Sequence, residues 1–262
     1  GIVPEGHPRF KHLLLHDQYA QDFFPLRKID LPADFKNHLA RRYEYLEVKG
    51  EGVYELPVGP IHAGVIEPGH FRFSCFGETI VNLEIRLGWV HRGVEKRLTE
   101  VPWQKAHFVA EAAASDTALA NAFAHAIAIE SILDLEITER AQYLRTIALE
   151  IERLAVHIID VGGIGTDIGL LGISSAMGRL RGKALGLADL LSGSRFLRGF
   201  IFPGGVRPVS ERKLSEIKAG VIALKKDLTP VIQILSDNQR ATERMKDLVK
   251  SSKSLDHEFG MV

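Results

Sequence analysis

An alanine-rich stretch at residues 110–130, AEAAASDTALANAFAHAIAIE, limits the possible folds of this chain more than any other segment. Its composition favours a helix, and its small side chains allow neighbouring backbones to approach closely. Four positions of this stretch are spaced i, i+3, i+7 and i+11 and would form one column on a helix, where its few polar side chains gather: Ala114, Thr117, Asn121 and His125. A buried helix with satisfied polar groups and a helix that lines a site both agree with this pattern.

The composition is that of an ordinary globular protein, since 45% of the 262 residues are hydrophobic and 25% are charged. The formal net charge is zero, which argues against nucleic acid as a partner, because proteins that bind it are usually basic. Cys75 is the single cysteine, so the chain has no internal disulfide, and a reducing compartment is expected. We predict that Cys75 is a buried structural thiol.

The hydrophobic pattern changes twice along the chain and predicts an α+β fold in three parts. Residues 1–50 are rich in His and Pro and predict an irregular arm with one short helix near 34–45. Residues 51–92 alternate polar and apolar residues, which predicts a small antiparallel sheet. Residues 93–262 predict a bundle of long helices, at about 105–131, 139–161, 174–193 and 210–249. Pro230 predicts a kink or break in the last of these helices.

The predicted helix 139–161 carries a continuous charged face formed by Glu150, Arg153, His157 and Asp160. A solvated surface would explain such a face. On a helix enclosed by neighbours, the same groups would have to pair with one another or line a cavity. Asp167 lies within a glycine-rich segment, IDVGGIGTDIGLLG, which we interpret as a connector between two helices. We hypothesise that His157 and Asp167 belong to a buried polar network.

Four segments together resemble one protein family in their order and spacing: PVGPIHAGVIEPGHFRF, LGWVHRGVEKRL, RLAVHIIDVGGIGTDIG and GSRFLRGFIFPGGV. The family comprises the large subunit of membrane-bound, energy-converting nickel–iron hydrogenases, including formate hydrogenlyase, and the quinone-site (D-type) subunit of NADH:quinone oxidoreductase. The resemblance covers roughly residues 58–206. The first fifty residues resemble the tail of the accessory (C-type) subunit that is fused to the large subunit in formate hydrogenlyase-type proteins.

The resemblance implies a subunit of a membrane-associated redox complex. Its partners would be an iron–sulfur subunit, which carries the cluster, and membrane subunits. The chain would be cytoplasmic and peripheral on the inner face of the cell membrane. No apolar run reaches the ~18–20 residues that a membrane span requires, so a partner would provide the attachment.

The family's metal ligands are missing from this sequence. Its Cys-Gly-x-Cys pair would fall at Ala114 and Thr117, and a family histidine would fall at Asn121. Glu111 still matches the family's glutamate. Because nickel and iron in such sites need thiolate ligands, we predict that the chain has no nickel–iron centre and no other metal or cofactor of its own.

The family's quinone ligands are also altered. A tyrosine of the quinone site corresponds to Ser115, and a hairpin histidine falls near Ile66, with His62 and His70 close by. The resemblance therefore gives two sets of candidate residues. The catalytic candidates are His157, Asp167 and Glu111, and the quinone- or ligand-binding candidates are His62, His70 and Ser115.

Three functions agree with these residues. The chain could be a redox subunit that couples electron transfer to proton or ion movement, a quinone-binding subunit with a rearranged site, or a non-catalytic scaffold that docks an iron–sulfur subunit. We also expect the chain to be part of a longer protein. If it were not, it would self-associate through the uncovered apolar faces of its helices.

Overall fold

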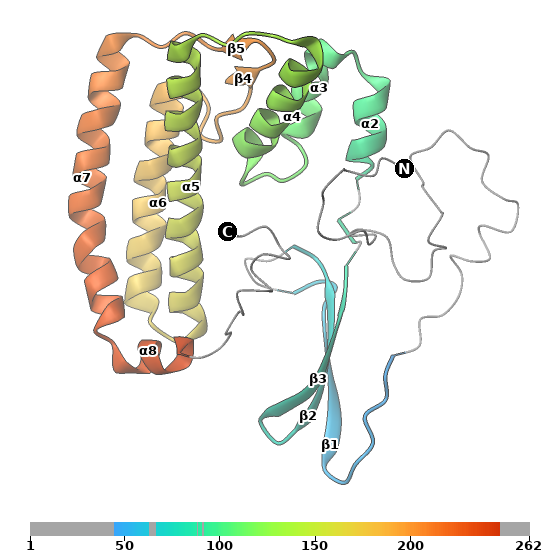
Figure 1. The fold of residues 1–262 in the computed structure, drawn as a ribbon. Coiled ribbons are helices and arrows are strands. Elements are labelled where there is room, and N and C mark those ends of the chain that lie inside the picture. The colour runs from blue at the N-terminus through green and yellow to red at the C-terminus, as the bar shows by residue number, and fades with distance from the viewer. Residues whose placement is uncertain (1–44, 63–66, 88, 91, 247–262) are drawn as a thin grey trace, which may run out of the picture. The chain divides into compact units, whose positions relative to one another are not determined.

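The computed structural model describes residues 45–62, 67–87, 89–90 and 92–246, which form two compact units (Figure 1). The sheet unit ends at Val90 and the helical unit begins at Arg92. The expected helix near 34–45 lies outside the described residues except for Tyr45, and residues 45–50 of the expected arm are irregular.

The sheet unit is a three-stranded antiparallel sheet, as predicted. Its strands are β1 (Val53–Val58), β2 (His70–Phe76) and β3 (Thr79–Arg86), in the order β1-β2-β3. Side chains alternate between the two faces of the sheet, so the cross-strand set Leu56, Phe73 and Leu83 lies on one apolar face. Cys75 on β2 is buried and free, which confirms the predicted structural thiol.

The helical unit is built on three long helices that lie side by side, α5, α6 and α7 (Figure 1). Its helices are α2 (Val94–Glu100), α3 (Trp103–Ala110), α4 (Ala118–Leu133), α5 (Glu139–Asp167), α6 (Leu171–Ser192), α7 (Glu211–Ser236) and α8 (Gln239–Met245). A short hairpin, β4 (Ile201–Phe202) with β5 (Gly205–Val206), connects α6 to α7. The predicted α+β class, with a small sheet followed by a helical bundle, is confirmed. No described helix is both long and apolar enough to cross a membrane.

The alanine-rich stretch is not the single helix that we expected. It forms the end of α3 and most of α4, and residues 111–117 between them are irregular. This linker contains Ser115, Asp116 and Thr117, three residue types whose side chains compete with the helical backbone for hydrogen bonds. Alanine content favours a helix on either side, and this polar triplet interrupts it.

The glycine-rich segment is helical rather than a connector between helices. α5 continues to Asp167, so only residues 168–170 separate it from α6. A Cβ at Gly162 would lie 3.1 Å from Cβ of Met177, and one at Gly165 would lie 3.2 Å from the Ser174 nitrogen. The glycines therefore allow α5 and α6 to approach closely at this end.

The last predicted helix is two helices, and the break does not occur at Pro230. α7 contains Pro230 and ends at Ser236. Asn238 then caps α8, because its side chain accepts a hydrogen bond from the Ala241 N–H at 3.0 Å. Asparagine is a preferred residue at this position, and its cap sets the start of the new helix.

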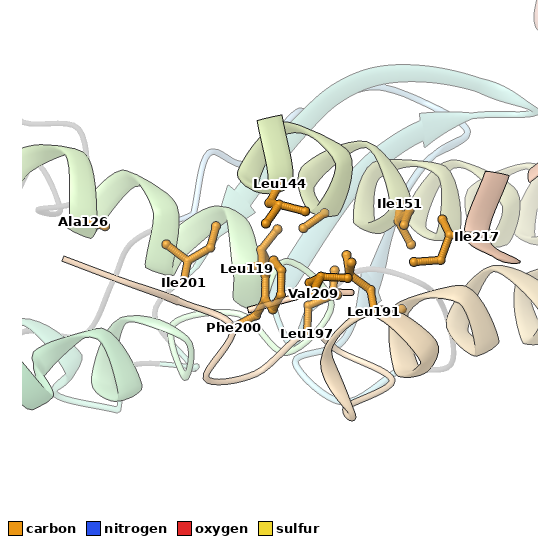
Figure 2. Close-up of a cluster of buried hydrophobic side chains, with 12 residues drawn as sticks. Leu119, Ala126, Leu144, Ile151, Leu191, Leu197, Phe200, Ile201, Val209 and Ile217 are labelled. Carbon is orange, nitrogen blue, oxygen red and sulfur yellow. The ribbon is translucent and has the colours of Figure 1, made fainter. Parts of the chain in front are cut away.

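The hydrophobic core that supports the candidate site joins α4, α5, α6, the β4–β5 hairpin and the start of α7 (Figure 2). Leu119 at the start of α4, Leu197 and Phe200 after α6, and Ile201 in the hairpin are almost completely buried there. Segments far apart in the sequence are thereby fixed around the linker 111–117. A second cluster, which includes Met177 and Leu180, packs α5 and α6 against α7 further along the bundle.

Candidate functional site

The first carboxylate of the site is Glu111, which directly follows α3 and begins the linker. Its side chain is only 3% exposed, and its Oε1 accepts a hydrogen bond from the Gly199 N–H at 2.6 Å. Burial raises the pKa of Glu111, and this effect is opposed by the Gly199 N–H and by the charges of Arg198 and Arg207. The carboxyl is therefore held in place, and its ionisation is less favourable than that of a carboxyl in water.

The second carboxylate is Glu152, which projects from the middle of α5 and is 7% exposed. Its two oxygens accept hydrogen bonds from the N–H groups of Leu119 at 2.7 Å and Ala120 at 2.9 Å. These are among the first N–H groups of α4, which have no acceptor within their own helix. Thr117 occupies the N-cap position but makes no capping bond with its side chain. Glu152 caps α4 from another helix instead.

Glu152 is also shifted toward its neutral form. Burial raises its pKa, and the negative charges of Asp116 and Glu111 raise it further, whereas the two capping N–H groups lower it. The coupling to Glu111 means that the charge on one carboxyl makes ionisation of the other less favourable. Buried carboxyls with such shifts are typical of sites that take up and release protons.

Glu152 can be approached from the surface through a small cavity between α5, α6 and residues 195–197. Asp116 and Arg181 also line this cavity, and the Asp116 Oδ1 lies 3.4 Å from Nη2 of Arg181. Its volume of about 10 Å³ is close to that needed for a single water molecule. The cavity is lined mostly by apolar side chains, and Asp116 and Arg181 are two of the charged residues that contact it.

A buried ion pair fixes the opposite end of α4. Nη1 and Nη2 of Arg145 donate to the two carboxylate oxygens of Glu130 at 2.8 and 2.5 Å. Arg145 also donates to the carbonyls of Phe202 and Gly205, and the Gly204 N–H donates to Glu130. Burial alone would raise the pKa of Glu130, but the bonds from Arg145 and Gly204 lower it overall. The pair attaches the β4–β5 hairpin to α4 and α5.

Sequence reasoning did not identify Arg145 or Glu152. The sequence did contain a signal, because the two charged residues are seven apart on a stripe of small residues along α5: Ala141, Ala148 and Ala155. A charged residue within such a stripe faces the neighbouring helices, and it must find a partner there.

The predicted polar column exists only in part. Asn121 and His125 are on α4, and the side-chain amide of Asn121 donates to the Thr117 carbonyl at 2.8 Å. Ala114 belongs to the irregular linker, so it does not continue the column as a helical position would. Ser115, the predicted ligand-binding residue, is in the same linker and is exposed.

The predicted buried network at His157 and Asp167 is wrong for this structure, because both residues are exposed. The face that includes Glu150 and Arg153 is exposed too, and these two form a surface ion pair. The reason is that α6, together with α4, packs against the other sides of α5. Their roles as catalytic residues remain predictions, and those roles would be performed at the surface of this chain.

The two predicted histidine ligands are in the sheet unit. Nδ1 of His70 lies 3.1 Å from the Gly59 carbonyl oxygen, and the His62 ring packs edge-on against Phe71. Their proposed action together with Ser115 stays a prediction. Within the described part of the chain, no group of three or more His, Cys, Asp or Glu residues is arranged to hold a metal ion.

Comparison with known proteins places the chain among respiratory and hydrogenase subunits. No protein-family model matches it. It is 31% identical to Hydrogenase-4 component G of Escherichia coli (strain K12), over 95% of this chain and 46% of that protein. It is 26% identical to the C/D subunit of NADH-quinone oxidoreductase from Phocaeicola vulgatus, over 94% of this chain and 51% of that protein. The chain thus spans about half the length of the curated relatives it matches.

A solved structure supports the same relationship. One chain of the membrane-bound sulfane sulfur reductase, an archaeal respiratory membrane complex, matches with a TM-score of 0.69 and 25% identity. The match covers 75% of this chain and 53% of that one. The resemblance predicted from the sequence motifs is confirmed: the chain is a homologue of subunits of hydrogenase and NADH-quinone oxidoreductase-type membrane complexes.

Proposed function

We propose that this chain is a subunit of a membrane-associated redox complex in which electron transfer is coupled to proton or ion translocation. The observation that carries the proposal is a pair of buried carboxyls, Glu111 at the start of the linker 111–117 and Glu152 on α5, whose charges disfavour one another. The linker also holds Ala114 and Thr117, where the resemblance places the metal ligands of hydrogenases. Proton-carrying groups would thus lie where redox chemistry occurs in similar proteins.

Within this proposal, Glu111 is the group that accepts and releases the proton. Its raised pKa brings the carboxyl closer to the neutral range in which a general acid or base is effective. The Gly199 N–H keeps the carboxyl in one position whether it is charged or neutral. Glu152 and the small cavity that Asp116 lines would form the next step toward solvent.

The remaining parts of the proposal concern the assembly. The partners would be an iron–sulfur subunit and membrane subunits, and the chain would be peripheral on the cytoplasmic face of the membrane. This agrees with its similarity to the alpha subunit of the membrane-bound hydrogenase of Pyrococcus furiosus and to a chain of an archaeal respiratory membrane complex. A quinone-binding role through His62, His70 and Ser115 is the second candidate, and the name of the NADH-quinone oxidoreductase relative favours it.

Replacement of Glu111 by glutamine tests the proposal in the assembled complex. Glutamine keeps the hydrogen-bond acceptor for Gly199 but carries no proton, so we expect proton translocation to fall by roughly 100-fold while the complex stays assembled. The measurement is proton movement into vesicles that contain the complex. Glu150→Gln, on the exposed face of α5, is the matched control and should leave the rate unchanged. Wild-type translocation by Glu111→Gln would refute the proposal.

The absence of a nickel–iron centre is a separate prediction. Ala114 and Thr117 provide no thiolate, and Cys75 alone provides one. We expect elemental analysis of the purified chain to find no stoichiometric nickel or iron. About one nickel per chain would contradict this prediction, because the metal would then need ligands other than a set of cysteine thiolates.

A further inference from the structure

A surface cavity of about 310 Å³ lies between α3 and the segment that includes the β4–β5 hairpin. α3 contributes Trp103, His107 and Phe108, and the other wall contributes Phe202 and Arg207. The volume is within the range of small-molecule sites, which begins at about 300 Å³. Neither Glu111 nor Glu152 lines this cavity, so its function is a separate question.

The walls of the cavity are aromatic and accessible. Trp103 is 42% exposed, Phe108 53% and Phe202 37%. A single exposed aromatic residue is ordinary, but three around one depression indicate a binding surface. The ring of His107 is buried and packs against Phe108 with 4.0 Å between centroids. Flat apolar surfaces of this kind favour a planar ring as the ligand.

Arg207 provides a positive charge in the cavity, and the amide residue Gln104 lines it as well. Arg207 has no carboxylate oxygen within 4.0 Å among the described residues, although its charge acts on Glu111, and its side chain lies against the backbone of Gly199. A Cβ at Gly199 would be 3.2 Å from Nη2 of Arg207 and 3.4 Å from Cε1 of Phe108. Gly199 has φ of +65°, a conformation that glycine adopts without strain. Glycine therefore lets the guanidinium lie beside the aromatic wall.

The hairpin wall is fixed before any ligand arrives. The carbonyls of Phe202 and Gly205 accept hydrogen bonds from the buried Arg145, each at 3.0 Å. The Gly204 N–H donates to Glu130 at 2.8 Å. A site held by buried hydrogen bonds loses little conformational freedom when it binds.

We propose that this cavity binds a small planar aromatic anion, with the ring against Trp103 and Phe108 and the carboxylate on Arg207. A guanidinium matches a carboxylate because its parallel N–H groups can bind both oxygens. The aromatic walls select a flat ring over an aliphatic one. This inference does not depend on the proposed redox function.

The test is titration of the full chain with 2-naphthoate, and binding is monitored through the NMR chemical shift of the Trp103 indole N–H. The chain has two tryptophans, so the signal is assigned with Trp103→Leu. We expect saturable binding with a dissociation constant on the order of 1 mM or tighter, as befits so small a ligand. Naphthalene-2-carboxamide lacks the charge and cyclohexanecarboxylate lacks the flat ring, so each should bind at least ~10-fold more weakly.

The matched variants are Arg207→Gln and Arg212→Gln. Arg212 is an exposed arginine at the start of α7, and its partner there is Glu216. We expect Arg207→Gln to weaken binding of 2-naphthoate at least ~10-fold and Arg212→Gln to leave it unchanged, with the circular dichroism spectrum of both as in the wild type. Failure of the wild-type chain to bind 2-naphthoate saturably, or equal binding by Arg207→Gln, overturns the proposal.

Discussion

Replacement of Arg145 by leucine should lower the free energy of unfolding by about 3–5 kcal/mol. The side chains of Arg145 and Glu130 are 3% and 8% exposed, so the variant would leave a buried carboxylate without its cation. It would also leave the carbonyls of Phe202 and Gly205 without a donor. The measurement is urea denaturation followed by circular dichroism, because a loss of this size moves the midpoint well beyond experimental error.

The control is a second arginine on the same helix. Arg153 pairs with Glu150 at 2.5 Å, but both side chains are about half exposed or more. Leucine at position 153 should therefore change stability by no more than about 0.5 kcal/mol. If Arg145→Leu does not fold, the double variant Glu130→Leu with Arg145→Leu should recover a measurable part of the stability, because it leaves no unpaired charge. Equal effects of Arg145→Leu and Arg153→Leu would contradict the structural role of the buried pair.

Glutamine at position 152 should make the stability of the chain less dependent on pH. The folded state raises the pKa of Glu152 from its ordinary value of 4.5, so the folded protein binds this proton more tightly than the unfolded chain does. The contribution of Glu152 to stability is therefore largest below pH 4.5 and declines as the pH rises through the folded pKa. Glutamine resembles the neutral form, so the decline due to this residue should disappear.

Urea denaturation at a series of pH values between 4 and 8 measures this effect as the difference between wild type and Glu152→Gln. Glu150→Gln, on the exposed face of the same helix, should follow the wild-type curve. Glu152→Ala should in addition lose about 1–3 kcal/mol at every pH, because the buried N–H of Leu119 would have no acceptor. Parallel curves for wild type and Glu152→Gln would show that Glu152 is not shifted as described.

The sequence predicted the parts of the fold that depend on repeating patterns. The alternation of polar and apolar residues located the three strands. Helical periodicity located α5, α6 and α7, and the majority of their ends were predicted to within a few residues. The prediction from sequence failed where a single tertiary contact overrides the preference set by local composition. The alanines of 110–130 favour one continuous helix, yet the break at Ser115–Thr117 gives α4 an N-terminus that Glu152 caps. A cap supplied from another helix leaves no trace in the local sequence.

The candidate site was predicted less well than the fold, for the same reason. Glu111 was found through its match to the family, whereas Glu152 and Arg145 were missed because each finds its partners 15 residues or more away along the chain. The prediction of a buried His157 depends on its helix being enclosed on all sides, and in the structure this residue is exposed. Which face of a helix its neighbours cover depends on tertiary packing, and the charged pattern alone does not determine it.

The bond between Glu111 and the Gly199 N–H joins residues that are 88 positions apart, which bears on the order in which the protein folds. α5 and α6 follow one another directly, so they can form a helical hairpin early through contacts that are close in sequence. During synthesis, the linker 111–117 cannot adopt its final conformation until residue 199 has been added to the chain. Until then the carboxyl of Glu111 remains in water. The raised pKa of Glu111 is therefore acquired only when the segment after α6 closes over it.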